Sequence, residues 1–269
     1  MTMDTARKYG ATYALLFRNS LVRDMAFKAN FILWIVTELL WFFGQIVFVD
    51  VMFRQTDRIL DWTKWEVVLL IGTHQVISQL FQSFFYVNLA NLPELVRTGK
   101  LDLMLLLPVD AQFSVSVRQF GLDNVVTGFV GAGIVAYSLH RLAVAPGIAQ
   151  WMLYAFALLF GIAIHYAVMF VLATASFWIV RAQGLIYGYF NLVSLARYPE
   201  GIYRGAFRFV FLWILPVILV ANVPARILVR PGESPWSGLL QLGGAAILSL
   251  LLTRALWKFA LRRYSSASS

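Results

Sequence analysis

Residues 91–108 read NLPELVRTGKLDLMLLLP and separate two long apolar stretches of the chain. Asn91 is suited to cap a helix, Pro93 suits its first turn, and Glu94 stands three residues past the cap. Gly99 can adopt the left-handed conformation that ends a helix. A helix of about two turns is unstable alone in water, so it requires a surface or a partner.

The whole chain has the composition of a membrane protein. Of its 269 residues, 60% are hydrophobic and only 13% are charged, and the mean hydropathy is +0.74. A soluble domain carries about 25% charge. Cysteine is absent, which excludes disulfides and cysteine metal sites. The net charge of +9 indicates basic flanks of membrane helices rather than a nucleic-acid-binding surface.

Several stretches reach the roughly 20 apolar residues that a transmembrane helix needs. We predict an all-α membrane domain over 31–263 with six spans, at 31–53, 66–90, 111–139, 148–180, 207–223 and 236–260. With the N-terminus inside, sixteen of the 22 lysines and arginines fall in cytoplasmic segments. This asymmetry predicts that both termini are cytoplasmic.

Two segments depart from plain transmembrane helix. Residues 1–30 place apolar side chains at helical spacing among five basic residues, which predicts an amphipathic helix in the membrane interface. The predicted span at 207–223 is short, contains Pro216, and leads into further prolines. A re-entrant segment at about 222–236 and a proline-kinked helix with an external loop are both compatible with this pattern.

The order of these parts resembles the permease subunits of ABC-2 type exporters, and two motifs carry the resemblance. The first is a G-x-L-D-x-x-L-x-x-P pattern formed by Gly99, Leu101, Asp102, Leu105 and Pro108. The second, at 196–205, is similar to an R-Y-P-x-x-I-Y segment of one bacterial subgroup and includes Arg197, Tyr198, Pro199, Ile202 and Tyr203. We expect this second motif in a cytoplasmic loop.

The resemblance implies a mechanical role for the segment at about 91–100, as a coupling helix resting on a separate ATP-binding subunit. The residues expected to contribute are Asn91, Pro93, Glu94, Leu95, Arg97, Gly99, Asp102 and Pro108. The chain has no G-x-x-x-x-G-K-[ST] phosphate loop, so ATP and Mg²⁺ are expected on a partner ATPase dimer. The resemblance also implies a second permease chain, identical or homologous, in the bacterial cytoplasmic membrane.

A polar stripe interrupts the second predicted span. Lipid cannot satisfy its side chains, so the stripe must face another helix or a wet cavity. It comprises His74, Gln75, Ser78, Gln79, Gln82, Ser83 and Tyr86. Glu38 and Gln45 share nearly one face of the first span, and an ionisable residue at that depth predicts a functional site. Glu38 could instead pair with a basic side chain such as Arg118 or face a partner permease, and the stripe could serve helix packing alone.

The sequence contains no catalytic signature and no His, Asp or Glu cluster with metal-ligand spacing. The leading hypothesis is therefore a non-enzymatic permease subunit of an ATP-driven exporter. An ATP-independent secondary transporter or channel, and a structural membrane assembly protein, remain as alternatives.

Overall fold

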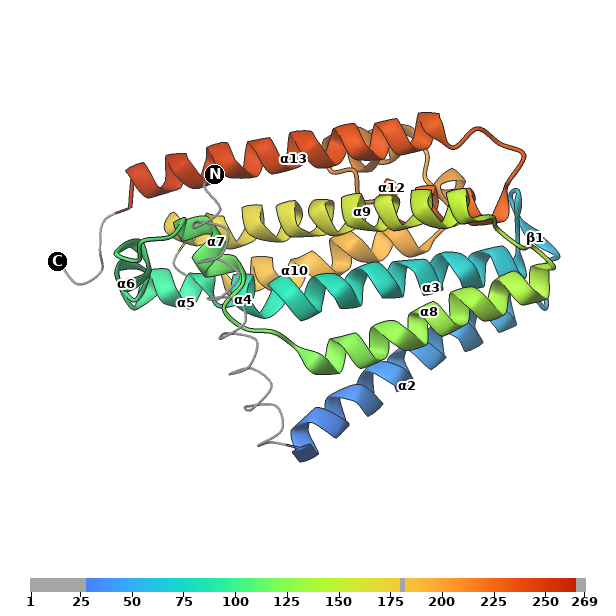
Figure 1. The fold of residues 1–269 in the computed structure, drawn as a ribbon, viewed down its shortest axis with the longest axis horizontal. Helices are drawn as coiled ribbons and strands as arrows, with labels where there is room; N and C mark the ends of the chain where they lie inside the picture. The colour runs from blue at the N-terminus through green and yellow to red at the C-terminus, as the bar shows by residue number, and fades with distance from the viewer. Residues whose placement is uncertain (1–27, 180–181, 265–269) are drawn as a thin grey trace.

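A computed structural model describes residues 28–179 and 182–264, so the helix predicted over 1–30 lies almost wholly outside the described residues. Long helices run side by side along one axis (Figure 1). These are α2 (Lys28–Met52), α3 (Lys64–Phe81), α8 (Leu122–Leu142), α9 (Ile148–Thr174) and α13 (Trp236–Arg262). Each contains an apolar stretch long enough to cross a membrane.

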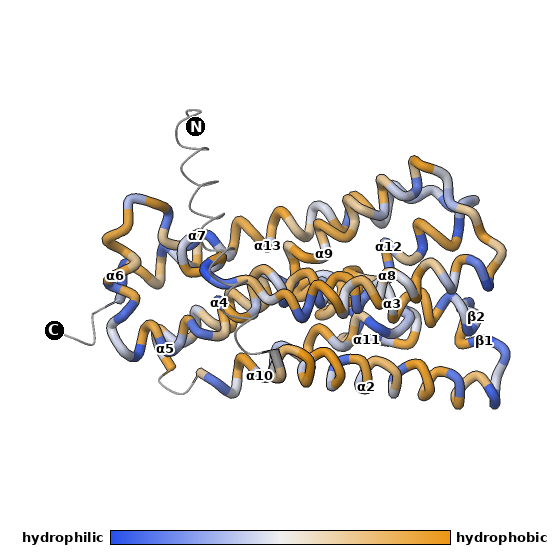
Figure 2. The backbone as a smooth tube through the Cα atoms, turned by 60° about the horizontal axis from the view of Figure 1, so that its bottom comes forward, coloured by the Kyte–Doolittle hydropathy of each residue, from blue (hydrophilic) through white to orange (hydrophobic). Residues whose placement is uncertain are grey.

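The two ends of the bundle differ. One end, here named the hairpin end, carries the short strands β1 (Arg58–Ile59) and β2 (Trp62–Thr63), which pair antiparallel. The opposite end, here named the α5 end, carries three short helices (Figure 1). They are α5 (Leu92–Arg97), α6 (Leu101–Leu105) and α7 (Ala111–Ser116). Hydrophobic residues dominate the helices between the two ends (Figure 2).

Helix α3 is the central helix. It begins the helical stretch Lys64–Arg97, whose apolar segment is 78% buried, against 11% for the apolar segment of Phe31–Met52. A Cβ atom added at Gly72 would lie 3.2 Å from the carbonyl oxygen of Gly131 on α8, and the reverse distance, from Gly131 to the Gly72 carbonyl oxygen, is also 3.2 Å. The absence of side chains at these two positions therefore permits the close α3–α8 crossing.

The prediction for the second span is confirmed and extended. The helix continues past Phe81 through a π-helical turn, Gln82–Tyr86, and through α4, Val87–Ala90. A π turn shifts the register of the side chains that follow it. The third span begins later than predicted, because α7 is separate and the long helix starts only at Leu122.

The prediction for the fifth span is wrong. The chain leaves α9 at the α5 end and reaches the hairpin end through α10 (Gln183–Val193), η3 (Ser194–Arg197) and η4 (Glu200–Ile202). At that end a Cβ added at Gly201 would lie 2.7 Å from the Leu60 side chain. The crossing is thus made by 183–202 and not by 207–223.

The segment predicted as span five instead enters the bundle and returns. It comprises α11 (Gly205–Phe209), η5 (Val210–Ile214) and α12 (Leu219–Val229), with an 85° bend between the two halves. Val220 packs near Gly161, midway along α9, whereas Arg230 pairs with Asp61 at the hairpin end. A re-entrant segment is therefore present, but it begins earlier than the predicted 222–236.

Candidate functional site

The polar stripe of α3 faces a cavity rather than lipid. This cavity, here named the stripe cavity, has a volume of about 90 Å³ and lies between α2, α3, the π-helical turn η1 (Gln82–Tyr86), α10 and η3. Its lining includes Glu38, Gln45, His74, Gln75, Ser78, Gln79, Gln82 and Arg197. Seven of these residues were predicted for a transport path from spans one and two. Arg197 joins them from a distant motif.

Glu38, on α2, contacts the polar stripe of α3 through a hydrogen bond that Gln79 Nε2 donates to its Oε2, at 3.2 Å. The alternative partner considered from the sequence, Arg118, is exposed and borders a separate groove at the α5 end. The α2–α3 contact therefore sets the carboxyl group of Glu38 against the side-chain amide of Gln79, which orients Glu38 toward the stripe.

Three buried polar atoms around the stripe cavity have no hydrogen-bond partner among the described residues. They are His74 Nδ1, Gln79 Oε1 and Arg197 Nε. Such groups cost roughly 1–3 kcal/mol each when left unpaired. One water needs roughly 10–15 Å³ of such cavity space, so the volume of about 90 Å³ accommodates water or a polar ligand group beside these atoms.

An aromatic and imidazole cluster adjoins the stripe cavity, and its Tyr189 is part of the cavity lining. Tyr189 and His165 are at most 1% exposed, and the Tyr189 hydroxyl lies 2.7 Å from His165 Nδ1. The His74 and His165 rings are 6.1 Å apart. Neither His165 nor Tyr189 was predicted as a site residue, because a lone histidine in an apolar helix carries no sequence signal of its partners.

Tyr86 does not line the stripe cavity. Its ring packs at 5.0 Å from that of Phe190 and 6.1 Å from that of Tyr189. Tyr86 is the last residue of the π turn Gln82–Tyr86, which changes the helix register. Tyr86 therefore supports the wall formed by α10 and is not a lining residue.

The short helix α5 is present where it was predicted, and Gly99 ends it with φ of 68°. Its buried residues, Leu92 and Leu95, pack against the bundle. Glu94 and Arg97 are exposed and joined by a hydrogen bond of 2.9 Å between Arg97 Nε and Glu94 Oε2. The apolar face of α5 is thus covered by this chain, and its charged face remains outward.

The predicted capping of α5 is wrong. Asn91 has a helical backbone (φ −87°, ψ −11°) and its side chain makes no capping hydrogen bond. Its backbone N–H already donates to Asn88 O at 3.2 Å, because the preceding helix leads almost directly into α5. No free helix N-terminus exists there for a cap to satisfy. Asp102 begins α6, and Pro108 lies exposed beyond its end.

The second motif does not lie at the same end as α5. Pocket walls near Arg197, Tyr198, Pro199 and Ile202 include residues of the hairpin end such as Ile59. The expectation that this motif lies at the same end as the coupling segment is therefore wrong, and Arg197 does not belong with the basic residues counted at the α5 end. The sequence could not show that 183–202 crosses the bundle, because this stretch contains few long apolar runs.

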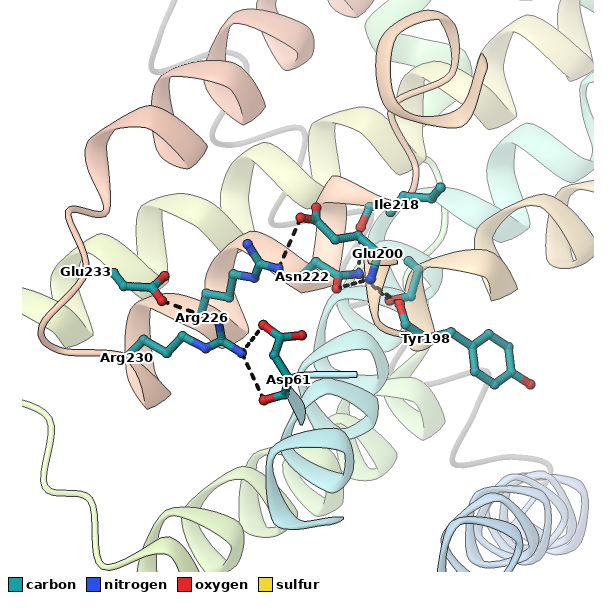
Figure 3. A network of polar contacts seen from close by, with 9 residues as sticks. Asp61, Tyr198, Glu200, Ile218, Asn222, Arg226, Arg230 and Glu233 are labelled. Carbon is teal, nitrogen blue, oxygen red and sulfur yellow. Dashed lines mark hydrogen bonds and ion pairs between the residues drawn. The ribbon is translucent and has the colours of Figure 1, made fainter. Parts of the chain in front are cut away.

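A polar network holds the re-entrant segment at the hairpin end (Figure 3). Asn222 is fully buried and its Oδ1 accepts a hydrogen bond from Glu200 N at 2.9 Å. Arg226 pairs with Glu200 at 3.1 Å, and Arg230 pairs with Asp61 at 2.6 Å. The second motif and the hairpin are thereby fastened to α12.

Asp61 lies outside the transmembrane helices. Burial alone would raise the pKa of its carboxyl, but the hydrogen bond and charge of Arg230 lower it below the usual range. Asp61 is therefore charged at neutral pH, and its ion pair with Arg230 persists there.

These features define the class: an all-α, multi-pass membrane protein with a polar cavity between helices and a re-entrant segment at one end. The family model described as ABC-2 family transporter protein matches residues 39–268. The chain therefore belongs to the ABC-2 transporter family and is a membrane transport component. No curated protein and no solved structure matches it.

Proposed function

We propose that the chain is the permease subunit of an ATP-driven exporter, in which α5 receives the force of a separate ATP-binding subunit. The observation that carries this proposal is the geometry of α5. Its apolar residues anchor it on the bundle, while Glu94 and Arg97 are exposed at the α5 end. A load applied to that charged face is transmitted to α3 through a nearly continuous helix.

The stripe cavity is the proposed transport path. It adjoins α3, the same helix that continues toward α5, and polar residues of α2, α3 and η3 contribute to its lining. Movement of α3 relative to α2 would break the Glu38–Gln79 hydrogen bond and open the cavity. Nucleotide-driven closure of two partner ATPases would thus shift the population of cavity states. We place α5 and both termini in the cytoplasm, and the permease in a dimer with an identical or homologous chain.

The coupling is tested by reversing charge on α5. The chain is purified with the ATPase encoded beside it, and Arg97→Glu is compared with Lys258→Glu, an exposed cation on α13. Arg97→Glu should reduce recovery of the ATPase about tenfold, because it breaks the Arg97–Glu94 pair and makes the outward face of α5 wholly acidic. Equal recovery of the ATPase with both variants would show that α5 is not part of the contact with the ATPase.

The path is tested by single cysteines, since the chain contains none of its own. Ser78→Cys should react with a charged thiol reagent to an extent that changes when ATP is trapped by vanadate. Ala157→Cys, at a fully buried position of α9, should stay unreactive in both states. A Ser78→Cys variant that is unreactive in every nucleotide state would contradict an aqueous path through this cavity.

A further inference from the structure

An open groove, here named the α5 groove, lies among α5, α6 and α7 and has a volume of about 390 Å³. Its floor and walls are chiefly apolar and include Leu103, Leu107, Phe113 and Val117. Leu103 and Leu107 are 68% and 50% exposed. The groove is separate from the stripe cavity, with which it shares no residue.

Two cations and one hydroxyl supply the polar groups of the groove. Lys100 and Arg118 are exposed at its margin, and no ion pair is formed by either within residues 28–179 and 182–264. Ser114 lines the groove, is 9% exposed, and its buried Oγ has no partner in that same part of the chain. An apolar trough with an unpaired hydroxyl and two free cations matches an acidic amphiphile.

We propose that the α5 groove binds an anionic phospholipid from the leaflet at this end of the bundle. One acyl chain occupies the apolar trough. The phosphate pairs with Lys100 and Arg118, and the Ser114 hydroxyl donates a hydrogen bond to a glycerol ester carbonyl. Because Leu95 of α5 forms part of the wall, the lipid would brace α5 against α7.

The position of the groove favours lipid as the occupant. Helix α7 is tied to α13 by the ion pair of Asp110 with Arg254, which lies two turns before the end of that apolar helix. The groove is therefore close to the level where headgroups meet the hydrocarbon. The chain's own residues 1–27 carry four basic and two acidic residues, so their net charge is repelled by the cationic margin.

The test uses the full chain in nanodiscs that contain phosphatidylglycerol with a photoactivatable acyl chain. Peptides covering 103–117 should be labelled by this lipid and much less by phosphatidylcholine with the same chain. Equal labelling of these peptides by both lipids would overturn the proposal, because the cations would then have no role.

Lipid retention measured by native mass spectrometry supplies the second readout. A cation near the membrane surface contributes about fivefold in binding an acidic lipid. Lys100→Gln with Arg118→Gln should therefore lower phosphatidylglycerol retention roughly 25-fold, whereas Lys258→Gln with Arg262→Gln, two exposed cations of α13, should not. Ser114→Ala should lower it by about fivefold without charge change.

The same experiment separates lipid from protein occupants. Addition of the ATPase should leave labelling of 103–117 in place. Loss of labelling together with a crosslink from these residues to the ATPase would assign the groove to that subunit. Equal retention in the Lys100/Arg118 and Lys258/Arg262 double variants would likewise refute the lipid site.

Discussion

Replacement of Asn222 by leucine should loosen the re-entrant segment more than any other single change in the hairpin-end network. Asn222 is fully buried, and its Nδ2 donates to Tyr198 O at 3.0 Å and to Ile218 O at 2.9 Å. Its Oδ1 accepts from Glu200 N at 2.9 Å. Leucine preserves the approximate volume but removes every one of these bonds.

The magnitude follows from the groups that leucine leaves behind. The Glu200 N–H and the Tyr198 carbonyl lose their Asn222 partner, and each costs about 1–3 kcal/mol if it remains buried and unpaired. Hydrogen bonds between membrane helices have measured values nearer 0.6 kcal/mol, because the reference state also finds partners. We expect a loss of about 2 kcal/mol in the free energy of unfolding, which combines both limits.

The assay is reversible unfolding in mixed detergent micelles, followed by tryptophan fluorescence. The matched control is Asn191→Leu, at an exposed position of α10, which should change stability by less than about 0.5 kcal/mol. If Asn222→Leu unfolds at the same denaturant concentration as the parent chain, the network does not hold the re-entrant segment and the reasoning fails.

Three further outcomes are expected. Gly131→Leu should lower the free energy of unfolding by about 1–3 kcal/mol in the same assay, because it disrupts the α3–α8 crossing. Gly133→Leu, at a position where a Cβ would have nothing within 4 Å, should leave stability unchanged. Equal effects of the two substitutions would refute the close approach of α3 and α8. Arg226→Glu should destabilise the chain by placing two carboxylates together, and Glu200→Arg in the same chain should restore part of the loss; no recovery would show that the pair is not a contact. Burial raises the pKa of the Asp110 carboxyl, but the hydrogen bond and charge of Arg254 outweigh burial and hold the folded-state pKa below the unfolded value of about 3.9. The ion pair therefore stabilises the fold above that value, and this stabilisation is lost as pH falls through the folded-state pKa. Asp110→Asn should flatten the acid side of the dependence of thermal stability on pH, measured by thermal unfolding.

The difference between α5 as predicted and as observed comes from continuity of the chain. The spacing of Leu92 and Leu95 and the position of Gly99 specified a short helix with one apolar face. The cap at Asn91 is absent because the preceding helix, which ends at Ala90 as predicted, leads into α5 through a helical backbone at Asn91 and leaves no separate helix start there. Local propensity identifies an end only where the neighbouring element really stops.

The stripe cavity shows a similar division. The spacing of His74, Ser78 and Gln82 at intervals of four placed polar groups on one helix face, and the cost of exposing them to lipid required a polar environment. The residues that form the wall of the cavity opposite the stripe could not be predicted from the sequence. Arg197 and Tyr189 come from a stretch more than a hundred residues away, and single-sequence periodicity carries no distance information between helices.

The sequence alone therefore determined the class of protein, the long apolar helices and the existence of a polar site, because hydrophobic length and helical periodicity are local properties. Only the tertiary structure decided that 183–202 crosses the bundle and that 205–229 enters and returns. The physical reason is that Asn222, Arg226 and Arg230 find their partners at Tyr198, Glu200 and Asp61. Those partners become neighbours only when the helices pack.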